Sequence, residues 1–173
     1  MTHSPVKKIC YVAMFVCIGI LAGYLESFIV LPVSVPGIKI GLSNIVTIIA
    51  LYLLGPLYAF FICVCRVLLS SILFGSGISS LYSITGALIS FIGMFLLFRC
   101  DKISVYGVSI AGGALHNASQ LAVALIIVKV PYLYYYFPIL IISGILAGFL
   151  IGFLSKMIID RLKKTGIFPD KGY

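Results

Sequence analysis

The sequence has little charge and very few acidic residues. Of its 173 residues, 9% are Asp, Glu, Lys or Arg, only four of these are acidic, and tryptophan is absent. Soluble domains carry about 25% charged residues, so this composition excludes an ordinary soluble protein. The sequence is instead 62% hydrophobic with a mean hydropathy of +1.26. These values indicate an integral membrane protein.

Three catalytic signatures are also missing. No glycine-rich loop followed by Lys and Ser or Thr is present, which excludes nucleotide hydrolysis through a P-loop. The four carboxylates, of Glu26, Asp101, Asp160 and Asp170, are scattered, so no acidic pair can hold magnesium against a diphosphate. His116 has no acidic residue nearby in sequence, so it is weak evidence for catalysis. We expect no catalytic residue and no cofactor, and a chain that binds but does not react.

The cysteines and the basic residues have structural interpretations. No His or carboxylate lies at ligand spacing from any cysteine, so we expect small core residues and no metal site. The net charge of +8 comes mostly from the chain ends and one loop, where the positive-inside rule places basic residues of a membrane protein. We therefore expect no nucleic-acid partner, and both termini in the cytoplasm. The cysteines are Cys10, Cys17, Cys63, Cys65 and Cys100.

The apolar runs predict an all-α protein with one transmembrane domain over residues 1–173. A bilayer core of about 30 Å requires roughly 20 apolar residues per helix. The second predicted span is short for a crossing, so either that helix tilts little or the loop before it dips into the membrane. The six predicted spans are 9–31, 43–54, 57–74, 81–98, 105–130 and 139–159.

Ionisable residues within spans are costly and normally face a bundle interior or a cavity. Arg66 lies near the middle of the third span, where a guanidinium costs at least about 2.5 to 3.5 kcal/mol, so it needs a partner. Glu26 lies near the outer end of the first span. Either the two form a salt bridge, or Arg66 or Lys39 binds an anionic group of a ligand. In the second case Glu26, at the upper rim of the pocket, holds a donor group of the ligand or orients Lys39.

A second polar group lies on the fifth span. His116, Asn117 and Gln120 share one side of a helix, which Ser109, Gly112 and Gly113 continue toward its start. Such a stripe faces a cavity or, alternatively, bonds to neighbouring helices. Small residues in the spans permit close helix packing. They include Ser83 on the fourth span, and Ala13 with Cys17 on the first, for which contact within the bundle and contact with a separate membrane subunit both remain open.

The stretch 37–44, Gly-Ile-Lys-Ile-Gly-Leu-Ser-Asn, interrupts the apolar runs. Together with Arg66, the segment 83–86, and residues 107–117 followed by Gln120, it resembles the Gx transporter family, also labelled heptaprenyl diphosphate synthase component I. More generally the chain is similar to the substrate-binding S components of energy-coupling factor (ECF) vitamin transporters. The resemblance covers nearly the whole chain.

This resemblance implies a six-helix subunit in a prokaryotic plasma membrane that captures a small molecule from the outer side. It would dock onto a transmembrane coupling subunit powered by two cytoplasmic ATPases. In such proteins the loop after the first helix covers the ligand, and an AxxxA-like motif, here Ala13 and Cys17, meets the coupling subunit. The residues expected to bind substrate are Glu26, Lys39, Asn44, Arg66, Ser83, His116, Asn117 and Gln120.

The expected ligand follows from the charge of that set. A positive pocket with amide groups suits an anionic ring compound, such as a flavin with its phosphate. The alternative from another class is a non-catalytic membrane subunit of a prenyl diphosphate or quinone biosynthetic enzyme, or of a redox complex. A self-sufficient secondary transporter is disfavoured, because such proteins contain two matching halves and this sequence contains none.

Overall fold

The computed structural model describes residues 5–28, 41–75, 77–100, 102–129 and 131–168, and within them it contains helices and no strand. Five helices are long and apolar enough to cross a membrane, which confirms an all-α membrane protein. The elements are α1 (Pro5–Ser27), α2 (Asn44–Leu53), α3 (Pro56–Phe74), α4 (Gly77–Phe98), α5 (Val105–Val128), the 3-10 helix η1 (Pro131–Tyr136) and α6 (Phe137–Lys164).

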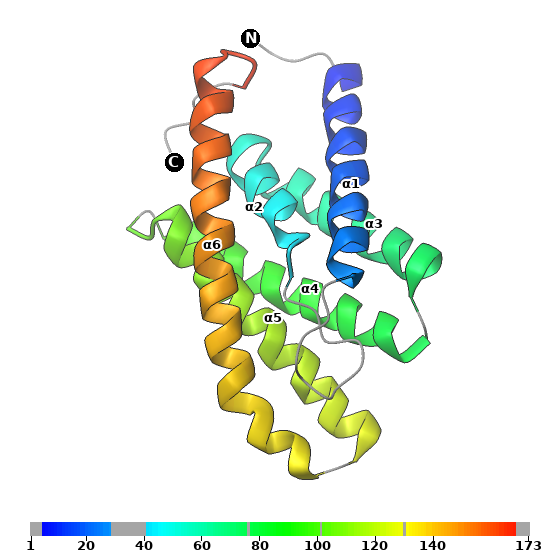
Figure 1. Cartoon of the computed structure of the whole chain (residues 1–173). Coiled ribbons are helices and arrows are strands. Elements are labelled where there is room, and N and C mark those ends of the chain that lie inside the picture. Colours follow the sequence, from blue (N-terminus) through cyan, green and yellow to red (C-terminus); the bar gives the residue numbers. More distant parts are fainter. Residues whose placement is uncertain (1–4, 29–40, 76, 101, 130, 169–173) are drawn as a thin grey trace.

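The helices pack as neighbours around α5 and α3. Helix α5 lies between α4 and α6, while α3 contacts α1, α2 and α4. Figure 1 shows that α1 begins and α6 ends at the same end of the molecule, while the connection between α5 and α6 lies at the opposite end. The basic residues at the end of α6, Arg161, Lys163 and Lys164, therefore lie at the same end as Lys7 and Lys8.

Helix α2 is about half the length of a transmembrane helix. Its 10 residues span about 15 Å, against a bilayer core of about 30 Å. Just before it, a Cβ on Gly41 would lie 3.3 Å from Cδ2 of His116, which is in the middle of α5. Helix α2 therefore begins at the level of the middle of α5 and runs toward the end of the bundle where α1 begins (Figure 1). The helix is therefore short because it starts at this depth, and the loop of residues 29–40, to which the other explanation of the short span applies, lies outside the described residues.

Two local features set where helices begin. Gly55 has φ +99° and precedes Pro56 at the start of α3, so a tight turn can separate α2 from α3. Ser104 caps α5 by accepting a hydrogen bond from the Gly107 N–H at 3.4 Å. Gly55 and Pro56 thus set the start of the helix that carries Arg66, and Ser104 sets the start of the helix that carries His116.

Helices α5 and α6 pack with their backbones in close contact. A Cβ on Gly113 would lie only 2.2 Å from the carbonyl oxygen of Gly144, and one on Gly148 would lie 2.7 Å from that of Ser109. The Ser109 hydroxyl donates to the Gly148 carbonyl at 2.6 Å. The glycines of α6 at positions 144, 148 and 152 thus form the surface on which α5 is held.

Candidate functional site

Arg66 is buried, with 3% of its surface exposed, and its guanidinium binds the N-terminal part of α2. Nε donates to Thr47 Oγ1 at 3.1 Å, Nη1 to Ser43 Oγ at 2.6 Å and Nη2 to Asn44 Oδ1 at 2.7 Å. Nη2 also lies 4.0 Å from Cys63 Sγ. Within the described part of the chain Arg66 forms no salt bridge. Its partners are neutral, so the guanidinium ties α3 to α2.

Asn44 extends this contact to two further helices. Its side-chain Nδ2 donates to Ser90 Oγ on α4 at 3.3 Å, and Ser90 Oγ donates to the carbonyl oxygen of Gly112 on α5 at 2.8 Å. Arg66, Asn44, Ser90 and Gly112 therefore form one chain of hydrogen bonds across α3, α2, α4 and α5. The amide of Asn44, a predicted ligand contact, is used in this chain.

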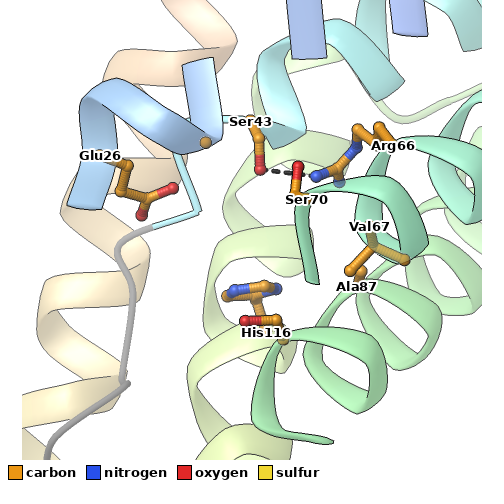
Figure 2. A pocket seen from close by; sticks show the side chains of 9 residues that line it. Glu26, Ser43, Arg66, Val67, Ser70, Ala87 and His116 are labelled. Atoms are coloured by element: carbon orange, nitrogen blue, oxygen red, sulfur yellow. Dashed lines mark hydrogen bonds between the residues drawn. The ribbon is translucent and has the colours of Figure 1, made fainter. Parts of the chain in front are cut away.

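A small cavity lies beside Arg66. Its volume is about 20 Å³, which is room for about one water-sized group. Figure 2 shows Glu26, Arg66 and His116 arranged around this space, with the bond from Arg66 to Ser43 drawn. The cavity is lined by Gly23, Glu26, Ser43, Arg66, Val67, Ser70, Ser83, Ala87 and His116.

Glu26 belongs to the wall of this cavity and not to an outer rim. Its side chain is only 4% exposed, and Oε1 accepts a hydrogen bond from the Gly41 N–H. Gly41 has φ +89°, a conformation that glycine adopts without strain. Because α1 ends at the level where α2 begins (Figure 1), the carboxylate reaches the depth of Arg66 and His116. Glu26 and Arg66 thus line one cavity without a salt bridge between them.

The ring of His116 occupies a slot between two glycines. A Cβ on Gly86 of α4 would lie 2.9 Å from His116 Cε1, and one on Gly41 would lie 3.3 Å from His116 Cδ2. The same Cβ on Gly86 would lie 2.9 Å from Gln120 Cγ. Glycine at these two positions therefore leaves the room that the imidazole fills, and His116 and Gln120 both lie against α4.

The polar stripe predicted on α5 divides between two neighbouring helices. Asn117 Nδ2 donates to the Leu140 carbonyl oxygen at 2.9 Å and to Ser143 Oγ at 3.1 Å, both on α6. Ser109 also bonds to α6. His116 and Gln120 instead lie against α4. Asn117 therefore serves contact between helices, the alternative that the sequence left open.

The structure brings together four of the eight predicted ligand residues: Glu26, Arg66, Ser83 and His116 line the cavity. Three of the other predicted residues do not line it. Asn44 accepts a hydrogen bond from Arg66, and Gln120 lies beside His116 against Gly86. Asn117 faces α6. Lys39 is outside the described residues.

Sequence reasoning missed Ser43, Thr47 and Ser70. Their spacing was the available signal: Ser43 and Thr47 are four residues apart, as are Arg66 and Ser70, so each pair shares a helix face. Ser43 and Ser70 line the cavity, and Thr47 holds Arg66.

The small residues of α1 divide into two faces. Gly19 and Gly23 pack inward, since a Cβ on Gly19 would lie 2.9 Å from Arg66 Cδ and one on Gly23 would lie 3.6 Å from Ser70 Oγ. Ala13 and Cys17 are exposed. The inward pair brings α1 close to α3, and the outward pair is left to contact lipid or another protein.

Comparison with known proteins assigns this chain to a family. No curated protein and no solved structure matched the sequence. The family described as heptaprenyl diphosphate synthase component I matches residues 15–158, a segment that contains Glu26, Arg66, Ser83 and His116. Because this match covers most of the 173 residues, the chain belongs to the heptaprenyl diphosphate synthase component I family.

Proposed function

We propose that this chain is the substrate-binding S component of an ECF-type importer in a prokaryotic plasma membrane, and that the ligand binds at the cavity of Glu26, Arg66 and His116. One observation carries the proposal: an acid, a guanidinium and an imidazole from three helices converge, all buried, at the level of the middle of α5. Groups of this kind are expensive inside a membrane and commonly mark substrate pathways.

The hydrogen-bonding groups of the cavity determine which donor and acceptor groups the ligand must carry. A guanidinium has five N–H groups, and the neighbours of Arg66 take up three, with a weaker contact to Cys63. In the described part of the chain, one N–H of Nη1 remains for a ligand acceptor. The carboxylate of Glu26 can accept several hydrogen bonds, so it can accept one from a ligand donor in addition to that from the Gly41 N–H. The ligand should therefore carry both an acceptor and a donor, a narrower requirement than negative charge alone.

The size of the cavity limits how much of the ligand it can hold. A volume of about 20 Å³ is far below the roughly 300 to 1,000 Å³ of small-molecule pockets. Only one polar group of a vitamin-sized molecule fits in it, so the remainder of the ligand must lie outside this cavity. A flavin remains one member of the ligand panel to be tested, with smaller molecules that carry both a donor and an acceptor.

The proposal assigns ATP hydrolysis to partner subunits and no enzymatic activity to this chain. The exposed Ala13 and Cys17 on α1 are the proposed contact with the transmembrane coupling subunit. Small exposed residues four apart let another helix approach closely.

Copurification from native membranes tests the proposed assembly. A tagged chain should retain a coupling subunit and two ATPases, and substrate uptake should stop when the ATPases are inactivated. Ala13→Leu should reduce this retention, whereas Ala122→Leu, at an alanine that is also exposed but lies on α5, should not. Equal retention by both variants would remove Ala13 from the interface, and recovery of no ATPase would overturn the proposal.

The family description favours one second candidate, a non-catalytic membrane subunit of a prenyl diphosphate synthase. The same copurification separates the two, because this candidate should retain a soluble synthase instead of ATPases. Mass spectrometry of the small molecule that copurifies with the chain would then identify the ligand. A polyprenyl diphosphate would favour the synthase subunit, and a water-soluble vitamin would favour the S component.

A further inference from the structure

A second hollow lies on the lipid-facing side of α3 and α4, away from the cavity. It is an open groove of about 270 Å³ lined by Pro56, Leu57, Phe60, Phe91 and Phe95. The first turns of α3 and the last turns of α4 form its walls. Leu57 and Phe60 are 64% and 41% exposed. Every lining side chain is apolar, so the groove suits a hydrocarbon chain and offers no side-chain partner to a polar group.

The floor of the groove is a row of aromatic rings. The centroids of Phe60 and Phe91 lie 5.6 Å apart, and Phe91 and Phe95 are stacked at 6.4 Å with 4° between their planes. Phe91 is buried, which holds this row in place. An occupant can therefore lie along α4 on a continuous apolar surface.

Positive charge lies at one end of this row. The guanidinium carbon of Arg99 lies 5.1 Å from the centroid of the Phe95 ring, and Arg99 is exposed. The exposed guanidinium of Arg99 is therefore the group at this end of the row that can bind an anion.

We propose that this groove binds one acyl chain of an anionic phospholipid of the bilayer, with the lipid phosphate at Arg99. An apolar row in contact with lipid selects a hydrocarbon chain, and the cation at its end selects a negative headgroup. A basic residue near an anionic membrane surface favours anionic lipid by about fivefold. The site is independent of the proposed ligand cavity and of transport.

The absence of tryptophan makes a direct fluorescence test possible. Phe60→Trp places one tryptophan in the groove, and Leu57→Trp places it at the more exposed wall in case the first variant does not fold. Phe149→Trp, at a site on α6 that is 50% exposed, is the control outside the groove. Each protein is reconstituted in vesicles in which either phosphatidylglycerol or phosphatidylcholine carries brominated, quenching acyl chains at the same total fraction.

We expect brominated phosphatidylglycerol to quench the groove tryptophan about fivefold more effectively than brominated phosphatidylcholine, with no such preference at position 149. Arg99→Gln should abolish the preference. Lys164→Gln, which removes the same charge at the end of α6, should leave it unchanged. Equal quenching by the two lipids at both groove positions, or a preference that survives Arg99→Gln, would overturn the proposal.

Discussion

Replacing Arg66 by lysine tests whether the guanidinium holds the start of α2. Arg66→Lys keeps the positive charge, so the cost of a cation within a span is largely unchanged. It removes the planar fork that reaches Thr47, Ser43 and Asn44 at 3.1, 2.6 and 2.7 Å, and an ammonium group cannot reproduce that geometry. The variant therefore isolates the hydrogen bonds from the charge.

The expected loss follows from the number of bonds. Side-chain hydrogen bonds between membrane helices average about 0.6 kcal/mol and reach about 1.7 kcal/mol. If lysine keeps one of the three contacts, we expect a loss of about 1 to 2 kcal/mol. Equilibrium unfolding in mixed micelles with increasing SDS, followed by helicity, measures this difference. Arg161→Lys, at an exposed arginine on α6, is the matched control and should leave the unfolding transition unchanged.

A double-mutant cycle with Thr47→Val sharpens the test, because valine has the shape of threonine without its hydroxyl group. The two substitutions should couple by about 0.6 kcal/mol, since they share the bond from Nε. The reasoning is refuted if Arg66→Lys unfolds like Arg161→Lys and shows no coupling to Thr47→Val. Arg66→Ala should also lower ligand affinity by more than about tenfold, measured only where its helicity shows a folded bundle.

Three further substitutions separate packing from binding. Gly113→Ala should destabilise the bundle by about 1 to 3 kcal/mol in the same SDS titration, because its Cβ meets the Gly144 backbone. Gly77→Ala, whose Cβ has nothing within 4 Å, should be nearly neutral, and equal stability of the pair would contradict the close α5–α6 packing. Gly41→Ala should cost about 1 to 2 kcal/mol, because φ is +89°, and an unchanged midpoint would exclude that conformation. Glu26→Gln should weaken ligand binding about tenfold by calorimetry, whereas Asn117→Ala should leave affinity unchanged; the reverse order would place the ligand at α6.

Much of this molecule could be predicted from local sequence. Hydropathy alone indicates helices that span a membrane, because backbone groups in lipid must be satisfied within their own segment. Arg66, Glu26 and His116 stood out for the same reason, since each is costly among apolar neighbours. Gly55 and Pro56 marked the turn between α2 and α3. These are properties of single helices and of the residues on either side of them.

The arrangement of the site depended on how the helices meet. Adjacent residues on a helix are about 100° apart, so His116 and Asn117 can face different neighbours, and the sequence does not say which neighbour lies where. Ser43, Thr47 and Asn44 became partners of Arg66 only because α2 begins beside α3.

The sequence by itself determined that this protein lies in a membrane and which few polar side chains must be sheltered there. Only the tertiary structure decided that Glu26, Arg66, Ser83 and His116 share a cavity while Asn117 faces α6. The role of Lys39 stays a prediction. The physical reason is that burial cost is local to a residue, whereas its partners are set by contacts between helices distant in sequence.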